Sequence, residues 1–119
     1  MKLYNRQDFL KLPPGVVYCS GRPYAFGTLS VKADTLGTND FVRLGLGWID
    51  SYDSGQAGER LDEMLATGAS YPMNECYGRD GGFDDEEVFL VFEAADLRKL
   101  IQMFTEAAEL VLPLSTQSA

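Results

Sequence analysis

The chain has 119 residues, of which 45% are hydrophobic and 12% aromatic, and its formal net charge is −8. This composition excludes a disordered chain and predicts one folded domain with its own core. The negative charge argues against DNA, RNA or anionic lipid as a direct partner, because affinity for phosphate depends largely on Lys and Arg.

The first half of the chain predicts a short helix followed by three strands. Asn5 is a suitable N-cap, acidic Asp8 stands at the third helical position, and Pro13 and Pro14 end the helix. Three stretches with strand character follow, separated by turn residues, which is typical of an antiparallel meander. The predicted helix covers residues 6–12, and the predicted strands cover 16–20, 24–32 and 41–49.

The third predicted strand has one strongly apolar face and one face that carries glycines. A period of two places four large side chains on the first face, which we predict to be core: Val42, Leu44, Leu46 and Trp48. Phe41 falls on the opposite face together with Gly45 and Gly47. Glycine inside a strand marks a bulge or a close approach by another backbone or a ligand, so we expect a strongly bent strand here.

The second half predicts a capped helix, a long loop, one buried strand and a final helix. Asp53 or Ser54 caps the first helix, and Gly68 suits the left-handed residue that ends one. The buried strand is apolar on both faces, which favours a central position in the sheet. We predict the helices at residues 55–66 and 94–110, the loop at 68–85, the strand at 86–92, and an end to the last helix at Pro113.

These elements give the order α-β-β-β-α-loop-β-α. The fold class we predict is α+β, with an antiparallel sheet of about four strands, two main helices and a short N-terminal helix. Residues 1–112 form a single domain in this prediction, and residues 113–119 form a flexible C-terminal tail.

The sequence carries no recognisable catalytic or cofactor motif. Histidine is absent, which removes the commonest general base and the usual activator of a serine or cysteine nucleophile. The phosphate-binding and dinucleotide-binding glycine patterns are missing, and neither acidic glycine-containing stretch follows the order of a calcium loop. We therefore expect a protein that is not an enzyme and that has no cofactor and no metal site.

The two cysteines and the N-terminal residues indicate the compartment. Cys19 and Cys76 are single and far apart, which predicts free thiols. The chain turns polar before an apolar stretch of signal-peptide length can develop, and no window resembles a membrane span. We expect a cytoplasmic protein.

Charge is divided unevenly, at +3 for residues 1–49 and −11 for residues 50–119. Our leading hypothesis is an interaction protein whose acidic face docks on a basic protein surface. Aromatic side chains of the long loop would supply the desolvated anchors, and the acids that follow would supply a negative electrostatic field that attracts the basic partner. The predicted partner-binding residues are Tyr71, Tyr77, Phe83, Asp84, Asp85, Glu86 and Glu87. In size, charge and lack of catalytic motifs, the chain resembles the small acidic inhibitors and nucleic-acid mimics of phages and mobile elements.

An alternative hypothesis is a module that binds an anionic metabolite or a nucleotide. Its pocket would lie between the glycine-bearing strand near Trp48 and the 68–85 loop, where Arg79 pairs with an anionic group. A homo-oligomer is compatible with either hypothesis.

Overall fold

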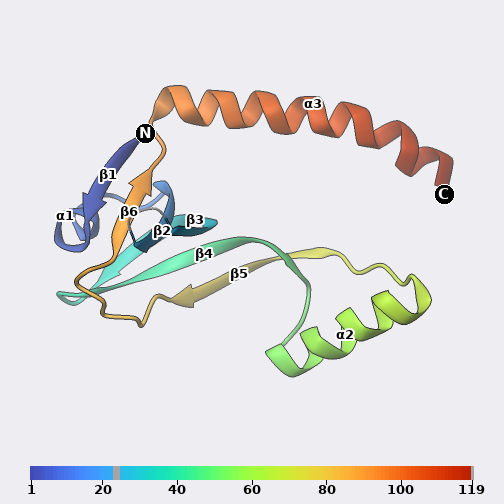
Figure 1. The fold of residues 1–119 in the computed structure, drawn as a ribbon, viewed down its shortest axis with the longest axis horizontal. Coiled ribbons are helices and arrows are strands. Elements are labelled where there is room, and N and C mark those ends of the chain that lie inside the picture. Colours follow the sequence, from blue (N-terminus) through green and yellow to red (C-terminus); the bar gives the residue numbers. More distant parts are fainter. Residues whose placement is uncertain (23–24, 119) are drawn as a thin grey trace.

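The computed structural model of the chain describes the backbone of residues 1–22 and 25–118, and the side chains of these residues apart from 46, 47, 75, 76 and 113–118. Figure 1 shows the arrangement of the elements. In chain order they are β1 (Lys2–Asn5), α1 (Arg6–Leu10), β2 (Val17–Arg22), β3 (Ala25–Leu36), β4 (Asp40–Ile49), α2 (Ser54–Thr67), β5 (Met73–Arg79), β6 (Val88–Val91) and α3 (Ala94–Ser118).

The strands form one antiparallel sheet with the order β1-β6-β2-β3-β4-β5. The predicted α+β class is confirmed, but the described residues contain six strands where the sequence predicted about four. The meander of β2, β3 and β4 is present as predicted. β6 pairs with both β1 and β2, so its predicted interior position is also confirmed.

Two strands were missed, and both lie at the edges of the sheet. β1 is a four-residue segment, too short to show a period of two, and it becomes a strand by pairing with β6. β5 falls inside the segment that was predicted to be a loop at 68–85, and that prediction was wrong. Its sequence has no period of two, and its conformation comes from pairing with β4.

The core lies between α1 and one face of the sheet. The Asn5 side chain accepts a hydrogen bond from the Asp8 backbone at 2.8 Å, as the predicted cap requires, and this turn directs Phe9 onto the sheet. The Phe9 ring stacks on Phe89 with centroids 4.0 Å apart and meets Tyr18 edge to face. Such aromatic pairs are worth about 0.5–1.5 kcal/mol each beyond the area they bury.

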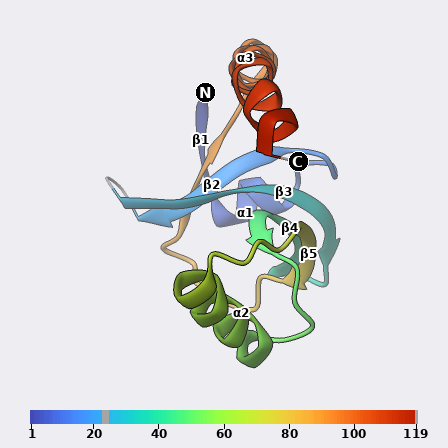
Figure 2. The ribbon, with the colours of Figure 1, turned by 90° about the vertical axis from the view of Figure 1, so that its right-hand side faces the viewer.

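The burial along β4 differs in part from our prediction: Val42 and Leu44 are half-buried, and the side chain of Leu46 lies outside the described residues. Phe41 is fully buried beneath α1, whereas Trp48 is 51% exposed. β4 was correctly expected to bend, because its pairing with β5 shifts register between Gly45 and Trp48. The bulge turns the far ends of β4 and β5 away from the rest of the sheet (Figures 1 and 2).

α2 is inserted between β4 and β5 and begins and ends as its sequence predicts. Asp53 accepts a hydrogen bond from the Gln56 backbone at 2.7 Å. At the other end Gly68 has a φ of 75° and donates its N–H to the Met64 carbonyl. The helix lies away from the sheet at the end of the bent β4–β5 pair (Figure 1).

α3 leaves the sheet in another direction and extends to Ser118, so the predicted end at Pro113 was wrong. Proline cannot donate to the carbonyl four residues earlier, and Figure 1 shows the helix bending toward its C-terminal end. Figure 2 shows α2 and α3 on opposite sides of the strands. Within the described residues, none of the helices has the combination of length and apolar character needed to cross a membrane.

Candidate functional site

The acidic run before β6 is largely neutralised by arginines from distant parts of the chain. Arg22 on β2 bonds the Asp84 carboxylate at 2.7 Å and the Glu86 carboxylate at 2.6 Å. Glu87 bonds a third cation, Arg6. Of the four predicted docking acids, only Asp85 has no cationic partner among the described residues. The run therefore holds the 80–87 loop against the sheet.

Arg6 is one of two cations that are buried to 1% exposure in the described part of the chain; the other is Lys32. Its guanidinium bonds Asp80 at 2.9 Å and Glu87 at 3.2 Å, and it donates twice more to Asn39. It lies over the rings of Phe41 and Phe89, with the guanidinium carbon 5.5 and 6.0 Å from their centroids. Sequence reasoning missed this residue, because its four hydrogen bonds reach three side chains and one backbone carbonyl on residues that lie 33 to 81 positions away.

A second buried group fixes the start of the same loop. Asp40 accepts hydrogen bonds from the backbone of Gly81 at 3.0 Å and from Arg79 at 2.9 Å. These donors hold the pKa of the Asp40 carboxyl below its usual range, with the Gly81 backbone as the largest cause. In contrast, burial and the nearby acids raise the pKa of Glu87. The loop is thus built around paired charges of both signs.

The alternative ligand site is spread along the β4–β5 pair. Arg79 stands opposite Val42, and Trp48 stands opposite Asn74. Asn74 and Arg79 are five positions apart on β5, a distance of roughly 17 Å along an extended strand. Arg79 is moreover ion-paired with Asp40 at 2.8 Å. The structure therefore places Trp48 and Arg79 at different points and in different surroundings.

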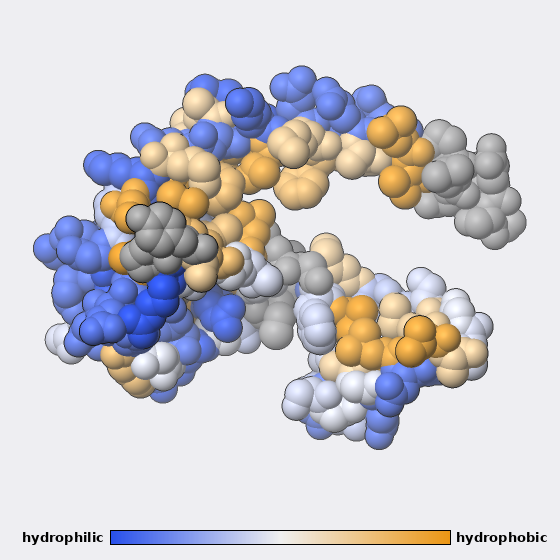
Figure 3. Space-filling model, viewed as in Figure 1, coloured by the Kyte–Doolittle hydropathy of each residue, from blue (hydrophilic) through white to orange (hydrophobic). Residues whose placement is uncertain are grey.

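A group of exposed apolar side chains lies elsewhere, on a projecting segment that we call the arm, formed by residues 48–77. It consists of the end of β4, the whole of α2 and most of β5. Figure 3 shows apolar surface on the side of this segment that faces α3. Its exposed large apolar residues are Trp48, Tyr52, Leu61, Leu65, Met73 and Tyr77.

Of the predicted anchors, the structure places Tyr77 on the arm, where its side chain is 64% exposed. Tyr71 is also there, but it packs against α2: its ring lies 4.6 Å from the Arg60 guanidinium, and its hydroxyl bonds Glu63. Phe83 is exposed but lies on the 80–87 loop, with an unusual φ of 51° for a bulky residue. Two of the three aromatic anchors thus belong to the arm.

Sequence reasoning missed the exposure of α2. Apolar residues recur at helical spacing along this helix, yet Leu65 is 90% exposed and the residue that is buried is Ala57. Glu59 and Asp62 on the same helix have no ion pair among the described residues. The amphipathic period reveals that a helix has an apolar face, but it does not say whether the same chain covers that face.

The described side chains contain no group of three or more Cys, Asp and Glu that could hold a metal ion. Among known proteins, no family model, curated protein or solved structure matches the chain. The candidate site is therefore identified from the residues of this chain alone. It is the apolar, aromatic arm together with Glu59 and Asp62 of α2, which have no ion pair among the described residues.

Proposed function

We propose that this chain is a small non-catalytic interaction protein whose arm docks on a basic surface of another protein. The observation that carries the proposal is the composition of the arm, which bears exposed aromatic and aliphatic side chains together with carboxylates that have no cationic partner among the described residues. Apolar anchors with a charged rim are typical of protein interfaces. The chain resembles small acidic inhibitors and nucleic-acid mimics in size and charge, and a cytoplasmic setting suits such a role.

The arm is a better candidate than the 84–87 acids for an electrostatic reason. Asp84, Glu86 and Glu87 already bond Arg22 and Arg6, so a basic partner would have to replace existing pairs. Glu59 and Asp62 can attract a partner without breaking an ion pair. Their field would raise the association rate and the specificity, and the arm's apolar residues would slow dissociation.

The test is a salt-graded capture experiment with two variants of equal charge. The arm variant is Glu59→Lys with Asp62→Lys, and the control is Asp34→Lys with Asp85→Lys, which also changes the net charge by four units at exposed acids without ion pairs. The immobilised chain is incubated with a native lysate, and the captured protein is identified, purified and titrated against each variant at low and high salt.

We expect the arm variant to weaken binding at least tenfold and the control to weaken it less than threefold. Binding should also fall as salt rises, because exposed charge attraction is screened. Leu65→Ser should weaken binding without changing this salt dependence. Equal losses in the two charge variants, or a greater loss in the control, would reject the arm as the docking site.

A further inference from the structure

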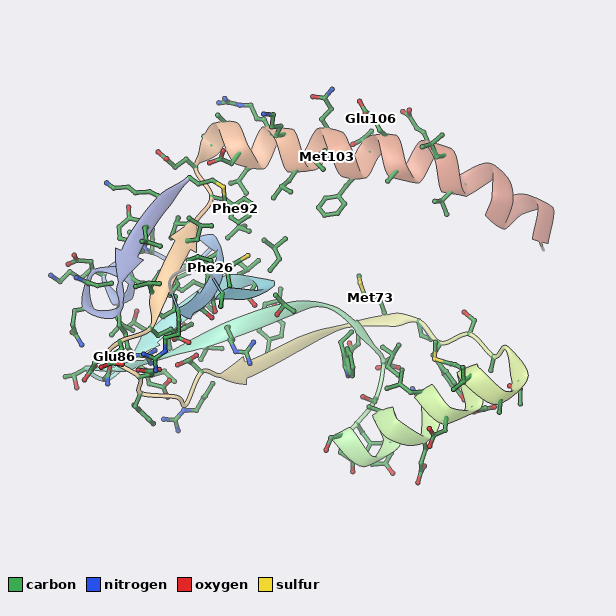
Figure 4. The ribbon with its side chains drawn as sticks, in the orientation of Figure 1. Phe26, Met73, Glu86, Phe92, Met103 and Glu106 are labelled. Carbon is green, nitrogen blue, oxygen red and sulfur yellow. The ribbon has the colours of Figure 1, made fainter. Side chains whose placement is uncertain are left out.

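β5 forms one edge of the sheet, and the structure leaves that edge open. The strand order ends at β5, which pairs with β4 on its other side. The described side chains of β5 are exposed, among them Met73 at 70% and Tyr77 at 64%. In Figure 4 the Met73 side chain projects into open space, away from α2. Among the described elements, β4 alone packs along β5.

The backbone hydrogen bonds show which groups of β5 face outward. At one end of the strand the Asp80 N–H donates to the Phe41 carbonyl, and at the other end the Asp50 N–H donates to the Pro72 carbonyl. Backbone groups of successive residues in a strand point to opposite sides. The register shift lies where β4 carries an extra residue, so this alternation is unbroken along β5. Even-numbered residues of β5 therefore bond β4, and the N–H and C=O groups at the free edge belong to residues 73, 75, 77 and 79.

The opposite edge of the sheet is built differently. β1 has only four residues and begins with Lys2, and short edge strands with lysines keep other chains from pairing with an edge. β5 has seven residues and contains neither lysine nor proline. Its single cation, Arg79, is already held by Asp40 at 2.8 Å. β5 is thus the edge of this sheet that is open to a further strand.

Charge indicates which kind of strand fits this edge. A row of alternating backbone donors and acceptors is matched by another extended chain. The arm carries six acids and one base, so its net charge is −5. Pairing with β5 of a second copy would bring two such arms together, and their like charges would repel. A segment that contains lysine or arginine would instead be attracted.

We propose that the partner of the arm docks by adding an extended basic segment to β5 as a further strand of the sheet. This inference rests on the function proposed above and supplies its mode of binding. The free backbone groups of β5 would provide the hydrogen bonds. Met73 and Tyr77 stand on the same face of the strand and would provide apolar contacts beside them.

The test is amide hydrogen exchange along β5, followed residue by residue by nuclear magnetic resonance. The probe is a synthetic peptide of alternating lysine and valine residues, and the partner captured in the experiment above is measured in the same way. We expect exchange at residues 73, 75, 77 and 79 to slow at least fivefold. The amides of residues 74, 76 and 78 already bond β4, so their exchange should change less than twofold.

Tyr77→Pro is the variant that tests the edge itself. Proline removes an N–H that faces outward, and edge strands tolerate it there because the bonds to β4 remain. Tyr77→Ala is the matched control, since it loses the same side chain but keeps the N–H. We expect Tyr77→Pro to bind the peptide at least fivefold more weakly than Tyr77→Ala, with the same far-UV circular dichroism spectrum. If Tyr77→Pro does not fold, the exchange pattern of the wild-type chain decides.

Three results would overturn strand addition. The first is no slowing, or uniform slowing along β5, at about 1 mM peptide. The second is slowing that grows with the concentration of the chain alone, which would indicate self-pairing. The third is a captured partner that depends on Glu59 and Asp62 but leaves the odd-numbered amides of β5 unprotected; the docking function would then stand without this mode. Equal losses in the two charge variants would instead reject the docking function, whatever the peptide does.

Discussion

The buried guanidinium of Arg6 gives the most direct test of how this fold is held together. Arg6→Met keeps much of the apolar stem and removes the charge, so Asp80 and Glu87 lose their shared cation. Both acids then remain at the base of the 80–87 loop. The pKa of Glu87 is already raised by burial and by Asp80.

The size of the effect follows from how deeply the three groups are buried. Removing one partner of a fully buried ion pair costs about 3–5 kcal/mol. The side chain of Arg6 is 1% exposed, whereas Asp80 and Glu87 keep 12% and 22% of theirs. Water can therefore partly solvate the acids, and we expect the lower end, about 3 kcal/mol. That is a large part of a total stability of about 5–15 kcal/mol.

The assay is urea unfolding followed by far-UV circular dichroism at one fixed chain concentration. Arg22→Met is the matched control, because Arg22 also makes two ion pairs but is 53% exposed. Pairs at such exposure contribute about 0–1 kcal/mol. A second variant that joins Arg6→Met with Asp80→Asn and Glu87→Gln should recover part of the loss. If Arg6→Met and Arg22→Met lose the same stability, the reasoning is refuted.

Two further predictions concern a buried acid and a close backbone contact. The pKa of Asp40 is lowered in the folded state, so its stabilising contribution is present above the ordinary value of 3.8 and is lost as pH falls through the folded value. Asp40→Asn should therefore be less stable at neutral pH, and its free energy of unfolding should fall less steeply as the pH is lowered. An unchanged slope of unfolding free energy against pH would contradict this. At Gly21 an added Cβ would lie 2.1 Å from the Ala25 carbonyl oxygen, so Gly21→Ala should cost about 1–3 kcal/mol. Gly78→Ala, which meets nothing within 4 Å, is its control, and equal melting temperatures for the two variants would count against the close contact.

Features set by neighbouring residues were predictable from the sequence. The caps at Asn5 and Asp53 and the left-handed Gly68 all stand where they were expected. Each depends on a hydrogen bond between groups within four residues of each other, so the local sequence contains the whole interaction. The interior position of β6 was predictable for a related reason, since a strand that is apolar on both faces needs cover on both sides.

The assignment of the core face of β4 shows where local patterns were insufficient. Residues 41–49 carry apolar side chains on both faces, so a period of two identified the faces without ranking them. The position of α1 decided which residues of β4 are buried, because α1 covers Phe41 and leaves Trp48 half exposed. Met73 to Arg79 is a similar case. This sequence has no strand pattern of its own, and it forms a strand only because it pairs with β4.

The acidic character of the second half of the chain could be read from the sequence by itself, because net charge is a sum over residues. Which of those charges are free for a partner was decided by the tertiary structure, which brings Arg6 and Arg22 to acids more than 60 residues away. The same holds for the apolar faces of α2 and α3. Periodicity established that the faces exist, but only the directions in which the two helices leave the sheet show them uncovered, since coverage depends on contacts between distant parts of the chain.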